Sequence, residues 1–124
     1  MSLETPLHRV RGLGSAHSGA GHFLHQRVTA IALIPLTVWF AISIVGLVGA
    51  SEVSVLIFLS HPLNAILMGA FVLCSLYHMA IGLQEVIVDY VPFEGFKLFL
   101  VLCDYGFAIA VAFASLLALL RIAL

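Results

Sequence analysis

The sequence predicts an all-α membrane protein with three transmembrane helices. The chain of 124 residues is 63% hydrophobic and only 9% charged, and its mean hydropathy is +1.20. Such a chain is too apolar to keep a polar surface around a soluble core. Three of its apolar stretches also reach the ~20 residues that a helix needs to cross a bilayer. The net charge of −1 argues against nucleic acid as a partner.

The three predicted spans cover about residues 28–50, 62–88 and 99–120. Residues 1–21 precede them as a Gly/Ser-rich N-terminal segment, for which irregular backbone is expected. Residues 22–124 then form the three-helix membrane anchor. An odd number of spans leaves the two ends of the chain on opposite sides of the membrane.

The distribution of basic residues predicts the orientation of the chain. Arg9, Arg11 and Arg27 precede the first span, and Lys97 lies in the loop between the second and third spans. Arg121 is the one basic residue on the other side. By the positive-inside rule, the N-terminus and the loop that holds Lys97 lie on the cytoplasmic or matrix side.

His78 is the most informative residue in the chain. No Asp, Glu, Lys or Arg occurs in residues 53–84, so we expect this histidine at membrane depth, where ionisable side chains are costly and usually functional. Gly82, Glu85 and Asp89 follow it at offsets of 4, 7 and 11. These offsets return to one face of a helix. A simple interhelical hydrogen bond remains the alternative role for His78.

The neighbours of His78 favour haem over zinc. Ala70, Cys74 and Gly82 share its helix face, and small residues leave room for a planar ring. Histidine is a usual axial ligand of haem iron, whereas zinc needs three or four clustered ligands. His61 lies 17 residues away on the same helix, about 25 Å, and the other four histidines precede the first span. A second axial ligand would therefore come from a partner chain.

Glu85, Asp89 and Tyr90 lie at the inner end of the second span. They are either the ordinary polar end of a helix at the interface or part of a quinone-binding site. In the second case Tyr90 can donate a hydrogen bond to a quinone carbonyl, and the two carboxylates can relay protons. Arg27 has a similar pair of possible roles, as an interfacial anchor or as a partner of haem propionates.

Asp104 lies inside the third predicted span, seven residues beyond Lys97 and so about 10 Å deeper. A carboxylate at this depth must face protein or water. We expect it to pair with a neighbouring cation, and a catalytic role is the alternative.

Two segments resemble a known family. Residues 78–84, HMAIGLQ, followed by Asp89-Tyr90-Val91, resemble the H-x-x-x-G…D-Y-V signature of the small hydrophobic anchor subunits of succinate dehydrogenase, complex II. Residues 27–31, RVTAI, resemble the R-x-T-A-I entry to the first helix of these subunits. Length, number of spans and orientation also agree, so the resemblance covers essentially the whole chain.

The resemblance implies roles for individual residues. As a D-type anchor, the chain would supply His78 as one axial ligand of haem b, with Gly82 beside it, and Arg27 would approach the propionates. Asp89 and Tyr90 would border the ubiquinone site. A second, cytochrome b-type anchor subunit would supply the other histidine and complete a hetero-oligomeric helix bundle. A flavoprotein with FAD and an iron–sulfur protein would dock on the inner face.

The resemblance thus implies a membrane anchor of succinate:ubiquinone oxidoreductase in the respiratory electron-transport chain. It indicates the bacterial cytoplasmic membrane rather than the mitochondrial inner membrane. The chain has no succinate site or flavin motif, so no catalytic residue for succinate oxidation is expected in it. One alternative is a haem-free anchor of a fumarate reductase working with menaquinone, which would not need His78. Another is a small structural or transport subunit whose buried polar residues only pack or relay ions.

Overall fold

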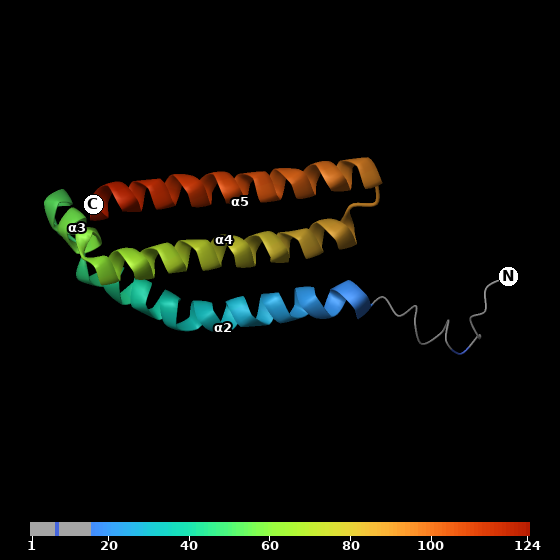
Figure 1. The fold of residues 1–124 in the computed structure, drawn as a ribbon, viewed down its shortest axis with the longest axis horizontal. Helices are drawn as coiled ribbons and strands as arrows, with labels where there is room; N and C mark the ends of the chain where they lie inside the picture. The colour runs from blue at the N-terminus through green and yellow to red at the C-terminus, as the bar shows by residue number, and fades with distance from the viewer. Residues whose placement is uncertain (1–6, 8–15) are drawn as a thin grey trace.

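Three long helices and one short helix make up the fold (Figure 1). The computed structural model describes residue 7 and residues 16–124, with the backbone alone for residues 16–19. The helices are α2 (Ala16–Gly46), α3 (Glu52–Ser60), α4 (Pro62–Tyr90) and α5 (Glu94–Ala123). The described residues contain no strand, and α2, α4 and α5 are long and apolar enough to cross a membrane. The predicted all-α fold with three transmembrane helices is confirmed.

The first long helix differs in extent from its predicted span. α2 begins at Ala16 and ends at Gly46, so the last residues of the Gly/Ser-rich segment are helical, although irregular backbone was expected there. Residues 1–6 and 8–15 of that segment lie outside the described residues. Hydropathy finds only the apolar part of a helix, whereas backbone hydrogen bonding can continue beyond it.

The loop expected between the first two spans contains α3. The hydroxyl of Ser51 accepts a hydrogen bond from the backbone N–H of Ser54 at 3.2 Å, a typical N-cap. Pro62 then starts α4, where its missing N–H has no cost. The Asn64 side chain donates to the Phe58 carbonyl at 2.9 Å and ties the two helices together. At nine residues, α3 is too short to register as a span.

The three long helices lie side by side in one layer, with α4 in the middle (Figure 1). α4 packs against both α2 and α5, whereas in the described part of the chain no Cα atom of α2 comes within 8 Å of α5. The start of α2 and the connection between α4 and α5 lie at one end of the layer, and α3 and the C-terminus lie at the other (Figure 1). The central helix therefore holds the layer together.

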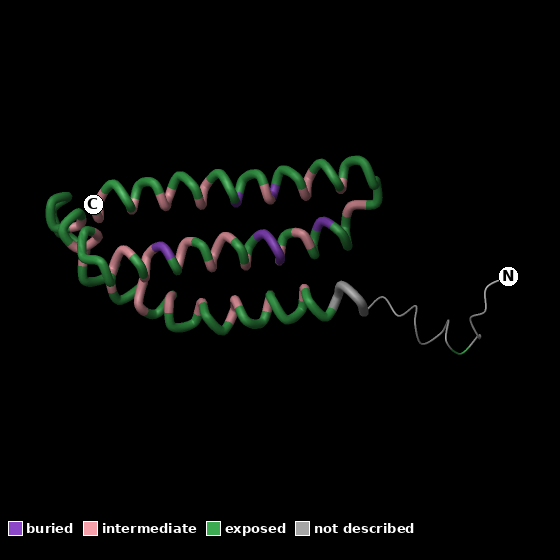
Figure 2. Tube along the Cα trace, in the orientation of Figure 1, coloured by how far each residue is buried: buried purple, intermediate pink, exposed green. Residues whose placement is uncertain are grey.

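In the part of the chain for which burial is described, the buried residues all lie on α4 and α5 (Figure 2). Among the described residues they are Gly69, Ala80, Ile81, Ile87, Asp104 and Ala108. Most of the large apolar side chains on the two faces of the layer are exposed in the isolated chain. Helix bundles normally bury such faces against further helices, so in a membrane these faces meet lipid or other subunits.

Candidate functional site

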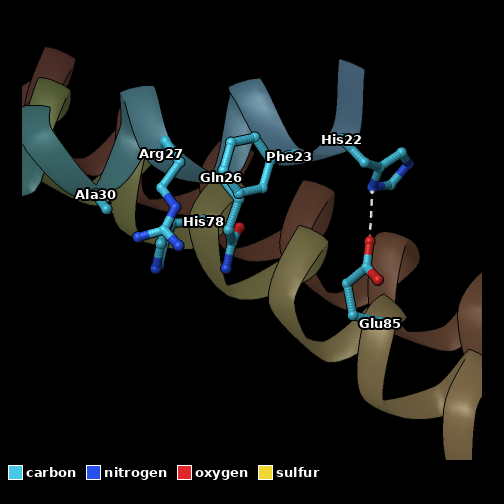
Figure 3. A pocket seen from close by; sticks show the side chains of 7 residues that line it. All are labelled: His22, Phe23, Gln26, Arg27, Ala30, His78 and Glu85. Atoms are coloured by element: carbon cyan, nitrogen blue, oxygen red, sulfur yellow. Dashed lines mark ion pairs between the residues drawn. The ribbon is translucent and has the colours of Figure 1, made fainter. Parts of the chain in front are cut away.

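A pocket of about 450 Å³ opens between the first half of α2 and the second half of α4. Figure 3 shows the side chains that line it, which come from both helices. They are His22, Phe23, Gln26, Arg27, Ala30, His78 and Glu85. The pocket thus combines an apolar wall with basic and hydrogen-bonding groups.

The ring of His78 lines this pocket and is half-buried. Its Nδ1 atom lies 2.8 Å from Oγ1 of Thr29 on α2. No other hydrogen bond to the ring is found among the described residues, so the Nε2 atom has no partner there. The thiol of Cys74, one turn earlier on α4, donates to the carbonyl oxygen of Thr29 at 3.6 Å.

Further polar contacts join α2 to α4. His22 Nδ1 lies 3.3 Å from a carboxylate oxygen of Glu85; this contact is the dashed line in Figure 3. His25 Nδ1 is hydrogen-bonded to the hydroxyl of Tyr77. These contacts fix the register of the two helices around the pocket.

Gly82 on α4 lies against the Gln26 side chain of α2. A Cβ atom added at this position would lie 3.0 Å from Nε2 of Gln26. A residue without a side chain therefore lets α2 and α4 pack closely here, as small residues do at membrane helix contacts. Gly82 supports the pocket from the side of the helix contact and does not line it.

Besides Nε2 of His78, Arg27 and Gln26 also present polar groups without a hydrogen-bond or ion-pair partner in the described part of the chain. The guanidinium of Arg27 lies 5.0 Å from the centre of the Phe23 ring, in the range of a cation–π contact, and it forms no ion pair with a described carboxylate. The Oε1 atom of Gln26 is buried and has no hydrogen-bond partner. Arg27 can therefore receive an anionic group.

The structure brings three of the predicted site residues, His78, Arg27 and Glu85, into one pocket. Asp89 and Tyr90 lie at the end of α4 and do not line it. The Tyr90 side chain is 82% exposed, so any site that it forms needs another molecule to enclose it. Glu85, predicted as part of a quinone site, lines the same pocket as His78 and Arg27 and contacts His22.

Sequence reasoning found Arg27 on α2 but missed the other polar residues that this helix contributes around the pocket. His22, Gln26 and Thr29 follow one another at intervals of four and three residues, which places them on one helix face. This spacing was available as a signal. It carried little weight because the residues that it joins precede or begin an apolar span, where polar side chains are ordinary interfacial residues.

The expected ion pair of Asp104 is not formed with any described residue. Asp104 is 6% exposed, and neither of its carboxylate oxygens has a hydrogen-bond partner in the described part of the chain. The prediction that it pairs with a neighbouring cation is therefore wrong for this chain by itself. Lys97 instead contacts Glu94, at 3.0 Å within the first turn of α5, because seven residues of helix separate it from Asp104 by about 10 Å.

Residues 1–120 match the family model described as "Succinate dehydrogenase/Fumarate reductase transmembrane subunit". The chain belongs to this family. The membership that the sequence motifs indicated is confirmed, and the three apolar helices make the chain a multi-pass subunit of a membrane complex. Family membership gives no support to an unrelated transport subunit.

Several curated relatives carry the name succinate dehydrogenase hydrophobic membrane anchor subunit. The relative from Rickettsia bellii is 35% identical, over 83% of this chain and 89% of its own length. The relative from Paracoccus denitrificans is also 35% identical, over 77% of this chain and 72% of its own. The relative from Rickettsia conorii is 31% identical, over 90% of this chain and 89% of its own length. No solved structure matches the transmembrane subunit significantly.

Proposed function

We propose that this transmembrane subunit is the D-type anchor of a bacterial succinate:ubiquinone oxidoreductase and that His78 is one axial ligand of its haem b. The names of the relatives support the assignment to a succinate dehydrogenase complex. The observation that carries the haem assignment is the position of His78, whose ring lines a pocket beside Arg27 while only its Nδ1 atom is bonded to the described chain. The bacterial relatives support the cytoplasmic membrane as its location.

The residues of the pocket fit haem b. Phe23 and Ala30 offer an apolar wall, Arg27 offers a cation for the propionates, and His78 presents the ring nitrogen that no described residue engages. When bound, haem b supplies a one-electron redox centre within the membrane. The Nε2 atom of His78 would hold the iron.

Arg27 and His22 would face the propionates of the haem. A guanidinium is well suited to carboxylates because its donors form a planar fork. His22 lines the same pocket, and its Nδ1 atom lies 3.3 Å from the carboxylate of Glu85. The second axial ligand would come from the second, cytochrome b-type anchor subunit.

Asp89 and Tyr90 would form part of the ubiquinone site at the end of α4. The phenol of Tyr90 can donate a hydrogen bond to a quinone carbonyl, and Asp89 can pass protons from the aqueous side. Glu85 lies one helical turn before Asp89 and contacts His22, so it would extend the proton route toward the pocket. The iron–sulfur and flavoprotein subunits would dock at this end on the cytoplasmic side, where FAD and iron–sulfur clusters oxidise succinate outside this chain.

The visible spectrum of the purified complex tests the proposal. The complex that contains this chain should give a reduced-minus-oxidised spectrum of a low-spin b-type haem, with one haem for each flavin. A complex that oxidises succinate but contains no haem would contradict the proposal. That result would instead support the haem-free anchor of a fumarate reductase, for which His78 has no metal to bind.

A further inference from the structure

We infer that Thr29 is a positioning residue that fixes the tautomer and the ring orientation of His78, so that the Nε2 lone pair is the one presented to the pocket. This inference rests on the proposed role of His78 as a metal ligand and adds what prepares the ring for that role. It is carried by the contacts of a single hydroxyl group.

The Oγ1 atom of Thr29 has three polar neighbours. It lies 2.8 Å from His78 Nδ1, 2.8 Å from the carbonyl oxygen of His25 and 3.1 Å from the carbonyl oxygen of Gln26. A hydroxyl has one proton to donate and two lone pairs that accept. The two carbonyl oxygens can only accept, so the hydroxyl proton points toward them and a lone pair remains for His78.

The opposite arrangement is unfavourable. If the hydroxyl proton pointed at Nδ1, the oxygen of Thr29 would stand within 3.1 Å of two carbonyl oxygens with no proton between them. A neutral imidazole has one nitrogen that donates and one that accepts, and the partner of one nitrogen decides the state of the other. With Nδ1–H donating to Thr29, the Nε2 atom of His78 is left with a free lone pair, which a metal requires.

The turn of α2 that holds Thr29 is itself fixed against α4. Cys74 donates to the Thr29 carbonyl at 3.6 Å, and His25, one turn before Thr29, is hydrogen-bonded to Tyr77. Both contacts reach α4 within four residues of His78. The hydroxyl of Thr29 is therefore held at a defined place relative to the imidazole.

A bound iron would respond to this hydrogen bond. An acceptor at Nδ1–H makes the imidazole a stronger donor to the metal, and loss of such a partner typically costs 10–100-fold in metal affinity. Stronger donation favours the oxidised iron. Removal of the Thr29 hydroxyl should therefore raise the midpoint potential of the haem and weaken its retention.

The test compares Thr29→Val with Thr29→Ser in the purified complex. Valine keeps the shape of threonine but has no hydroxyl, whereas serine keeps the hydroxyl. We expect Thr29→Val to retain haem about 10-fold less tightly, with a higher midpoint potential and shifted electron paramagnetic resonance g-values. Thr29→Ser should restore all three toward the wild type. Thr37→Val, at an exposed threonine of the same helix, serves as the matched control and should change none of them.

The results distinguish the role of the Thr29 hydroxyl from the role of His78 as the haem ligand. A wild-type potential and wild-type g-values in Thr29→Val, or equal changes in the Val and Ser variants, would overturn the role of the hydroxyl. His78→Ala in the same preparation tests the ligand itself, and unchanged haem in that variant would overturn the proposed function. Co-purification of the other subunits establishes assembly, and Thr29→Ala replaces Thr29→Val with the same expected changes if the latter does not assemble.

Discussion

At the scale of single residues, the two ring nitrogens of His78 have different surroundings. Nδ1 is bonded to Thr29 across the contact between α2 and α4, whereas the rest of the ring lines the pocket near Arg27. A histidine that only joined two helices would need no adjacent pocket with an unpaired guanidinium. The surroundings of His78 therefore favour the role of a metal ligand over that of a simple contact between helices.

Replacement of Arg27 by Leu should lower the midpoint potential of the haem and leave assembly intact. A guanidinium near the propionates disfavours the more positive, oxidised iron, so its removal favours that state. An effect of ~1 kcal/mol, expected for a charge in a partly solvated site, corresponds to ~40 mV, because 59 mV is a tenfold change in a one-electron couple. A redox titration of the haem measures it. An unchanged potential would return Arg27 to the role of an interfacial anchor.

Replacement of Tyr90 by Phe should slow quinone reduction and leave haem content normal. The ring remains, but the hydroxyl that would bond the quinone carbonyl is lost. Loss of one donor to an oxygen that gains charge in the transition state costs ~3 kcal/mol, or about 100-fold in rate. Succinate–quinone turnover is compared with succinate turnover using an artificial acceptor in the same preparation. Equal loss of both activities, or loss of neither, would leave Tyr90 as the interfacial end of a helix.

At the scale of helices, Gly82 of α4 faces Gln26 of α2. An added Cβ would lie 3.0 Å from the end of the Gln26 side chain, which is flexible and can move by a few tenths of an ångström. A side chain much larger than that of alanine would crowd Gln26 and press on the contact between the two helices.

Gly82→Ala should therefore retain most of the haem, whereas Gly82→Leu should lose it. Overpacking of this kind costs ~1–3 kcal/mol, and it acts where the register of the pocket is set. The haem-to-flavin ratio of the purified complex is the quantity to measure. A normal ratio in Gly82→Leu would show that the close approach of α2 and α4 is not needed for the pocket.

The sequence predicted some elements well because their signals are local. Three apolar stretches predict three long helices, since the thickness of the bilayer sets their length. The short helix α3 was not predicted because nine residues, of which six are apolar, carry no such signal. Thr29 was visible only within the R-x-T-A-I motif. Its contact with His78, 49 residues away in sequence, depends on the register between two helices.

Asp104 is a second residue whose contacts could not be predicted from the sequence, because they depend on which face α5 turns toward α4. In the described part of the chain Asp104 is buried without an ion-pair partner, and Lys97 contacts Glu94 instead.

At the scale of the whole molecule, the single layer of helices has two open apolar faces. α2 and α5 do not meet in the described part of the chain. The candidate pocket is lined by side chains of α2 and α4 alone. Such a layer leaves both faces open to lipid or to other subunits, which agrees with its membership in a family of transmembrane subunits.

The chain should therefore bind haem only together with its partner. Expressed without the second anchor subunit, it should reach the membrane without the low-spin b-type spectrum, and coexpression should restore that spectrum. Difference spectra of membranes from the two strains make the comparison. A full low-spin spectrum from this chain alone would mean that both axial ligands come from the same chain.

The most direct test of the account is the haem content of the assembled complex that carries His78→Ala. The substitution removes the imidazole but leaves the succinate-oxidising subunits unchanged, so turnover with an artificial acceptor should survive and show that the complex is intact. The account predicts that the reduced-minus-oxidised spectrum of low-spin haem b is lost in this variant. An unchanged spectrum in the correctly assembled complex would contradict the assignment of His78 as the axial ligand.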